Sequence, residues 1–101
     1  MAELLREAAD EMTSAAAWYE AQRDGLGDRF LYVVRATILR VDATPNAGAP
    51  WLVPKLALGV RRRTVPGFPF FVVYTTEPAI VIVAIAHMHR APTYWRARLR
   101  R

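Results

Sequence analysis

The hydrophobic pattern of the chain changes its period once, near residue 45, and this change limits the fold to helices followed by strands. Before it, apolar residues at spacings of three and four predict an amphipathic helix over residues 6–22. A second such stripe predicts a helix from residue 26 to Thr44, because a residue before proline disfavours helical dihedral angles. The glycines between them can form a left-handed cap, and Asp24 can cap the next helix. We therefore expect two antiparallel helices joined by a short loop.

Beyond a connector rich in Pro and Gly, three runs have the period and composition of strands. They cover residues 55–65, 68–74 and 80–87, and the short breaks between them favour an antiparallel meander. The last ten residues predict one or two helical turns, with Pro92 in the first turn. The predicted fold class is α+β: a two-helix hairpin (6–44) packed on a small, mainly antiparallel sheet (55–88), with a short basic helical tail (92–101), in a single domain (1–101).

The predicted sheet is apolar on both faces. Phe70, Val72 and Tyr74 would lie on one face and Phe71 and Val73 on the other, and residues 80–86 are apolar on both sides. One helical hairpin covers only one face of a sheet. The other face must be covered by the C-terminal tail, by a second copy of the chain, or by a partner.

Charge divides the chain into an acidic half and a basic half. Residues 1–50 hold five arginines and eight acidic residues, a net charge of −3, whereas residues 51–101 hold eight arginines and one lysine against Glu77, a net charge of +8. A basic, arginine-rich half of this kind is expected to bind nucleic acid or an acidic protein segment. The chain has no cysteine and no apolar run long enough for a membrane span, so we expect a cytoplasmic protein without membrane contact.

The two histidines close to the end of the last predicted strand could take part in acid/base chemistry. Metal-free RNA cleavage needs a base, an acid and cations, and His87 or His89 with Arg61, Arg63, Arg90 and Tyr94 could supply them. The alternative is that His87 is a core or rim residue at the end of a strand. Two histidines without a third ligand make a poor zinc site, so we expect neither a metal nor a cofactor.

The order of the predicted elements and several short motifs resemble the ParE branch of the RelE/ParE toxin superfamily over nearly the whole chain. The motifs are Trp18-Tyr19-Glu20, the run Gly25-Leu26-Gly27-Asp28-Arg29-Phe30, Gly67-Phe68-Pro69-Phe70, and Ala86-His87 with Arg90, Pro92, Tyr94 and Trp95. Members of this family usually open with a longer first strand, for which only residues 1–5 are available here.

The resemblance implies a toxin of a type II toxin-antitoxin pair. Its partner would be a ParD-like antitoxin, a ribbon-helix-helix protein whose C-terminal segment wraps the toxin and which makes most of the DNA contact. The implied target is DNA gyrase, and the alternative is ribosome-dependent messenger RNA cleavage of the RelE type. Phe68 is followed by Pro69 where RelE-type ribonucleases carry an arginine, so we expect no enzyme activity.

Three sets of site residues follow from these considerations. Trp18 and Tyr19 are expected to pack the hairpin on the sheet or to flank the antitoxin, and Arg61 and Arg63 are expected to bind carboxylates or phosphates. A third interpretation, direct nucleic-acid binding, is disfavoured because it leaves the apolar face unexplained. The expected antitoxin-binding residues are Trp18, Tyr19, Phe30, Arg61, Arg63, Phe70, Val72 and Tyr74; the target-binding residues are Arg90, Tyr94, Trp95, Arg96 and Arg98; the alternative catalytic set is His87, His89, Arg63 and Arg90.

Overall fold

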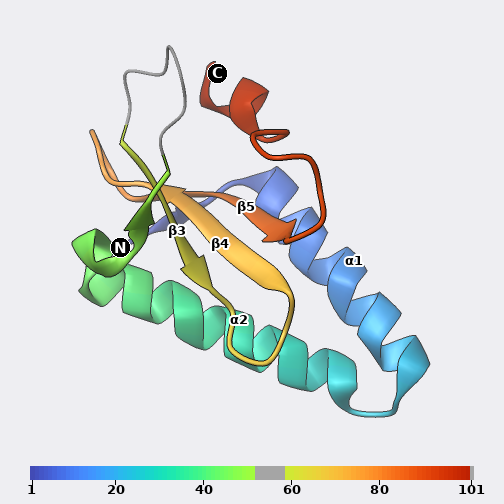
Figure 1. Cartoon of the computed structure of the whole chain (residues 1–101). Coiled ribbons are helices and arrows are strands. Elements are labelled where there is room, and N and C mark those ends of the chain that lie inside the picture. Colours follow the sequence, from blue (N-terminus) through green and yellow to red (C-terminus); the bar gives the residue numbers. More distant parts are fainter. Residues whose placement is uncertain (52–58, 101) are drawn as a thin grey trace.

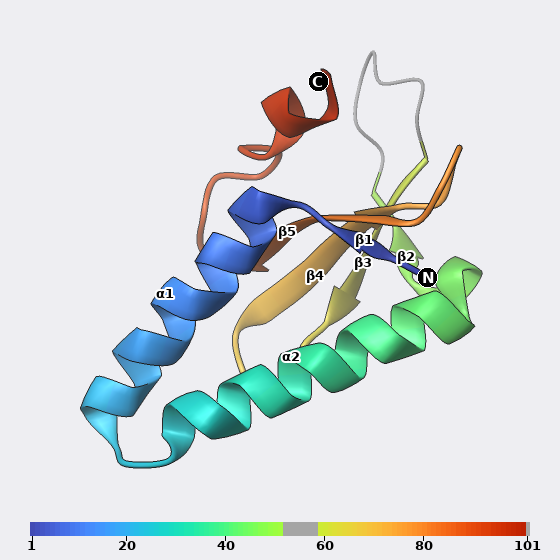
Figure 2. The ribbon, with the colours of Figure 1, turned by 180° about the vertical axis from the view of Figure 1, so that it is seen from behind.

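The computed structural model of the chain describes residues 1–51 and 59–100, and its two long helices form an antiparallel hairpin. Helix α1 spans Arg6–Gln22 and helix α2 spans Leu26–Ala43, as the apolar stripes predict. Figures 1 and 2 show both helices on one side of the sheet, with α1 running beside β5. The α+β fold class is therefore confirmed.

The sheet has five strands in the order β1-β5-β4-β3-β2, two more than the pattern predicts. The strands β3 (Val60–Thr64), β4 (Phe70–Thr75) and β5 (Val81–His87) form the predicted antiparallel meander. Each sheet edge carries a two-residue strand: β2 (Ala49–Pro50) is antiparallel to β3, and β1 (Glu3–Leu4) is parallel to β5. Residues 55–58 of the predicted first strand lie outside the described residues.

The loop between the helices differs from the prediction in its capping residue. Gly25 occupies the N-cap of α2 with a φ of 85°, a left-handed conformation that favours glycine. No side chain caps the helix from that position, so Asp24 is not the cap. Instead, the Glu20 carboxylate on α1 accepts hydrogen bonds from the Gly25 and Gly27 amides, both at 2.9 Å. These bonds lower the pKa of Glu20.

The face of the sheet toward the helices carries the larger core. Tyr19 and Phe30 on the helices pack against Phe68 and Phe70, with ring centroids 4.9 to 6.3 Å apart. Val72, Tyr74, Ile82 and Ile85 continue this core along the strands. The buried Tyr74 hydroxyl donates to the Pro45 carbonyl at 2.6 Å, in a 3-10 helix (Pro45–Ala47) that follows α2.

The C-terminal tail covers the other face of the sheet. Of the three covers considered for this apolar face, the structure thus shows the chain's own tail. Trp95 is fully buried and packs with Val73, Val83, Ala84 and Ala86 in a second core. The tail ends in a 3-10 helix, Arg96–Arg100, and Pro92 lies before it in a turn and not in its first turn. In Figures 1 and 2 the tail returns from the end of β5 past the start of α1.

Among the described residues, the structure contains no helix that is both long and apolar enough to span a membrane.

A close approach of the helices at Gly27 predicts a strong effect of one methyl group. A Cβ at Gly27 would lie 2.5 Å from the Ala16 carbonyl oxygen, so Gly27→Ala must separate the helices. We expect a loss of about 2 kcal/mol in the free energy of unfolding, measured by urea denaturation, which exceeds the gain of up to about 1 kcal/mol in helix propensity. In Gly59→Ala the Cβ would meet only an atom at 3.6 Å, and we expect little change. Equal stabilities of the two variants would contradict this packing.

Candidate functional site

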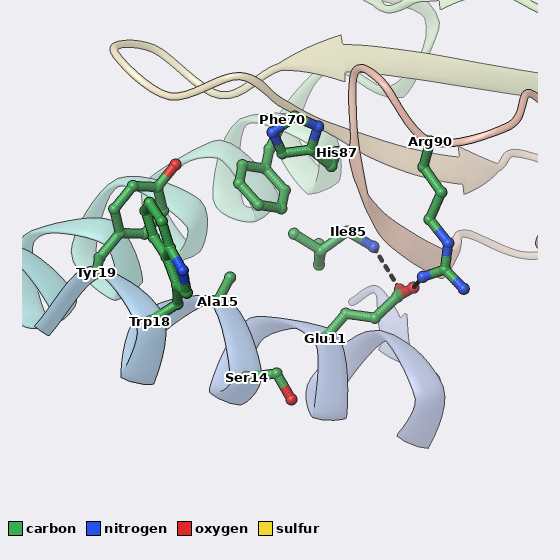
Figure 3. Close-up of a pocket in the computed structure, with 9 residues that line it drawn as sticks. All are labelled: Glu11, Ser14, Ala15, Trp18, Tyr19, Phe70, Ile85, His87 and Arg90. Carbon is green, nitrogen blue, oxygen red and sulfur yellow. Dashed lines mark hydrogen bonds and ion pairs between the residues drawn. The ribbon is translucent and has the colours of Figure 1, made fainter. Parts of the chain in front are cut away.

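A groove lies between α1 and the outer edge of β5, and we call it the α1–β5 groove. It has a volume of about 380 Å³. Figure 3 shows Trp18 and Tyr19 at one end, Glu11 and Arg90 at the other, and Phe70, Ile85 and His87 opposite the helix. The groove is lined by Glu11, Ser14, Ala15, Trp18, Tyr19, Phe70, Ile85, His87 and Arg90.

Trp18 makes the groove a candidate binding surface, because the side chain is large, apolar and 61% exposed. Its ring packs edge-on against Tyr19, with centroids 5.2 Å apart, while Tyr19 is anchored in the aromatic core. Fixed, exposed tryptophans are enriched among residues that dominate binding energy. The other end of the groove is charged, and the Arg90 side chain is 54% exposed.

The Glu11 carboxylate holds that charged end together, although its side chain is only 15% exposed. Arg98 contacts it with both terminal nitrogens, at 2.9 and 3.1 Å, and Arg90 donates to it at 3.3 Å. The Tyr94 hydroxyl donates to Oε2 at 2.5 Å, and the Ile85 amide donates to Oε1 at 3.0 Å. We call Glu11, Ile85, Arg90, Tyr94 and Arg98 the Glu11 network.

This network occupies the sheet edge that the short β1 leaves uncovered. Strand β1 pairs only with Val81 and Ile82. Beyond them, Arg98 donates to the Val83 carbonyl at 3.0 Å, and Glu11 accepts from the Ile85 amide. Side chains thus satisfy backbone groups that a longer edge strand would otherwise pair.

Burial and charge alter the titration of two members of the network. Burial raises the pKa of Tyr94 far above its ordinary value, and the hydrogen bond and charge of Glu11 act in the same direction. Burial alone would lower the pKa of Arg98, but its hydrogen bond to Glu11 and the Glu11 charge outweigh burial and raise the pKa. Both groups therefore keep the protonated forms that bind Glu11.

The five residues expected to bind a target do not form one exposed surface. Trp95 is fully buried, so its expected role at the surface is corrected to a core role that covers the second face of the sheet. Tyr94 and Arg98 are partly buried and face Glu11, and Arg96 is partly buried as well. Arg90 is the most exposed of the five.

The residues expected to bind an antitoxin also separate into groups. Phe30, Val72 and Tyr74 are fully buried and Phe70 is nearly so, which makes them core residues and corrects their expected place at the surface. The prediction that Trp18 packs the hairpin on the sheet is wrong, because the side chain is exposed, whereas the same prediction for Tyr19 is confirmed. Phe70 and Tyr19 nevertheless line the α1–β5 groove beside Trp18.

Two arginines of that set bind backbone and side-chain oxygens of the chain itself. Arg61 donates to the Gly48 carbonyl at 2.7 Å, and both terminal nitrogens of Arg63 lie 3.4 Å from the Thr44 hydroxyl. Arg61 and Arg63 thus tie β3 to the end of α2 and the segment after it. Neither lines the groove.

The alternative catalytic set is only partly assembled. The rings of His87 and His89 are 5.2 Å apart, and the His89 amide donates to Nδ1 of His87 at 3.0 Å. Arg90 follows them directly, but Arg63 lies on β3, with β4 between it and β5. Within the described residues no group of three potential metal ligands occurs.

Two features of the site lay outside the sequence reasoning. Glu11 is one of eight acidic residues in the first half of the chain, and nothing local distinguishes it from the others. Its position one helical turn before Ala15 on the face toward β5 is visible only once the strand and the tail are placed. Nothing in the sequence distinguishes Trp51 either, because it lies in the connector, outside the predicted helices and strands.

The Tyr94 hydroxyl leads to a prediction about stability and pH. Tyr94→Phe removes a hydrogen bond to a carboxylate, and we expect it to lower the free energy of unfolding at pH 7 by about 1.5 kcal/mol. The folded-state pKa of Tyr94 is raised above 10, so its stabilisation is complete below pH 10 and is lost as the pH rises toward the folded-state value. The difference between wild type and variant should therefore narrow above pH 10 in urea denaturation.

The exposed Tyr32 provides the control, and its replacement by phenylalanine should change stability by less than about 0.5 kcal/mol. A stability difference between wild type and Tyr94→Phe that stays constant above pH 10 would argue against a Tyr94 phenol held neutral by its surroundings.

Comparison with known proteins identifies the family. No curated protein matches the chain. Among solved structures, one chain described as "Chromosomal ParDE TA system from P. aeruginosa" superimposes with a TM-score of 0.63 at 22% sequence identity, covering 87% of this chain and 95% of that chain; at this identity the likeness concerns the fold. A family model described as "ParE toxin of type II toxin-antitoxin system, parDE" matches residues 2–92. Because the match covers most of its length, the chain belongs to the ParE toxin family of type II toxin-antitoxin systems.

Proposed function

We propose that this toxin poisons DNA gyrase by binding rather than by catalysis, and that a ParD-like antitoxin neutralises it. Family membership supports the toxin role, and the α1–β5 groove is the observation that carries the antitoxin contact. The antitoxin would be a ribbon-helix-helix protein that makes most of the DNA contact of the complex. Its C-terminal segment would occupy the groove.

The chemistry of the groove indicates what kind of segment it takes. Trp18, Ala15 and Phe70 offer an apolar surface, and Arg90 and His87 lie on the wall toward the tail. An amphipathic segment with a carboxylate near Arg90 would match both parts. Glu11 already binds Arg90 at 3.3 Å, so the incoming carboxylate would share that guanidinium with Glu11.

The gyrase contact is assigned to the exposed surface around Arg90, because the other expected target residues are partly or fully buried. Arg90 also lines the α1–β5 groove. Antitoxin in the groove would then cover part of the surface that contacts gyrase, and this overlap accounts for neutralisation. The separation of Arg63 from the histidines supports a toxin that acts without catalysis.

The antitoxin contact is tested with the ParD-type antitoxin that restores growth to cells producing the toxin. Trp18→Ala should weaken the affinity at least about 10-fold, because an exposed tryptophan in a groove is a typical dominant contact. The matched control is Tyr32→Ala, which removes an aromatic side chain that is 74% exposed on α2 and outside the groove. Isothermal titration calorimetry measures both, and a similar loss in the two variants would place the antitoxin elsewhere.

The target is tested with purified toxin released from its antitoxin, in a gyrase supercoiling assay that also scores trapped cleaved DNA. We expect lost supercoiling and trapped cleavage, both reversed by antitoxin. Arg90→Ala should require at least about 10-fold more toxin, whereas Arg40→Ala, at an exposed arginine on α2, should behave as wild type. Unaffected gyrase at concentrations that stop growth would instead favour RNA cleavage, which His89→Ala should then abolish.

A further inference from the structure

A second cavity, of about 270 Å³, lies between the strands and the C-terminal tail, beside the second core. It is distinct from the α1–β5 groove, although His87 and Arg90 line both. Aromatic and arginine side chains dominate its lining, and no acidic residue lines it. We call it the tail cavity.

Arg62 forms one wall of the tail cavity. Its guanidinium lies 4.6 Å from the centre of the Trp51 ring and 5.2 Å from that of Phe71. A guanidinium that stacks on aromatic rings keeps its N–H donors free at its edges. Unlike those of Arg61 and Arg63, the side chain of Arg62 makes no hydrogen bond or ion pair within the part of the chain that the structure describes.

Arg90 forms a second arginine-aromatic pair at the same cavity. Its guanidinium lies 3.7 Å from the centre of the Tyr94 ring. One terminal nitrogen donates to Glu11, and the side chain is 54% exposed. The cavity therefore has two guanidinium groups that lie over aromatic rings, and both retain donors for a ligand.

Trp95 adds an unpaired donor. Its side chain is fully buried and lines the cavity, and its indole Nε1 has no hydrogen-bond acceptor among residues 1–51 and 59–100. A buried N–H without an acceptor costs free energy, so such groups are rare in folded proteins. Because this nitrogen is itself buried, an acceptor could reach it only after the surrounding side chains move.

We infer that the tail cavity binds a phosphodiester group of single-stranded nucleic acid, with the adjoining base against its aromatic lining. The phosphate oxygens accept from Arg62 and Arg90, as guanidinium and phosphate geometry favours. The net charge of +8 in the second half of the chain attracts a polyanion. The cavity is compact, whereas an acidic helix would need an extended groove, so a nucleotide is the better fit.

The reason for rejecting direct nucleic-acid binding also disappears in the structure. That reason was an apolar sheet face without a cover, and Trp95 and its neighbours cover that face. The inference is independent of gyrase and of the antitoxin. It therefore survives if either part of the proposed function is wrong, and it can fail while both hold.

The test is binding of a fluorescein-labelled thymidine 12-mer of single-stranded DNA to the full-length toxin, measured by fluorescence anisotropy at several salt concentrations. Arg62→Gln and Arg62→Lys should each weaken binding at least about 5-fold, the second because lysine keeps the charge and loses the planar fork. Arg62→Gln should also reduce the slope of log affinity against log salt by about 1. The matched control is Arg29→Gln, at an exposed arginine on α2, where we expect less than a 2-fold change.

Several results would overturn the inference. Equal effects of Arg62→Gln and Arg29→Gln would mean general attraction of a polyanion. Displacement of the oligonucleotide by millimolar inorganic phosphate at matched ionic strength would mean a site for a lone anion. Tight binding of a glutamate-rich peptide that depends on Arg62, with no oligonucleotide binding, would assign the cavity to a protein partner.

A second measurement leaves the cavity residues unchanged and so does not depend on how they tolerate substitution. The chain has three tryptophans, and Trp18→Phe leaves only Trp51 and Trp95, which both line the tail cavity. Saturation of this variant with the oligonucleotide should change the tryptophan emission intensity by at least about 20%, as base stacking near an indole does. Saturated binding with unchanged emission would place the nucleic acid outside the cavity.

Discussion

The Glu11 carboxylate on the first helix binds both the last strand and the C-terminal tail. It binds Arg98 through both oxygens and accepts from the Ile85 amide and the Tyr94 hydroxyl. Removal of one charged partner from this partly buried network would leave a charge without compensation. The position of Trp95, and with it the cover of the second sheet face, depends on this anchoring of the tail.

Contacts within the chain, in the Glu11 network and at β3, determine which arginines are available to a ligand. Arg98 is held by Glu11 and by the Val83 carbonyl, and Arg61 and Arg63 are held by Gly48 and Thr44. These arginines have a structural role, because each side chain donates a hydrogen bond from its own element to another part of the chain. Arg62, and in part Arg90, keep donors that no other described residue binds. Several arginines of the basic half are thus engaged within the chain, and its net charge overstates the number of groups available to a ligand.

The helices and the meander could be predicted because each has a repeating hydrophobic period, and Phe30, Val34 and Val41 on α2 occupy the expected buried face. The two-residue strands β1 and β2 could not, since two residues contain no period. Of the residues expected to bind an antitoxin, Trp18, Tyr19 and Phe70 line the groove, whereas the Glu11 network was not predicted. A contact 87 residues apart in sequence, such as Arg98 with Glu11, has no local signature.

An aromatic residue among arginines usually indicates a binding surface, but Trp95 is buried. Such a tail resembles a binding surface in sequence, yet here the Trp95 ring fills the second core and Arg98 binds Glu11 and the Val83 carbonyl. The exposed aromatic residue of the α1–β5 groove is Trp18, on α1. His87 and Arg90 line both the α1–β5 groove and the tail cavity, whereas Arg62 lines the tail cavity and not the groove. An antitoxin confined to the groove would therefore contact two residues of the tail cavity without reaching Arg62.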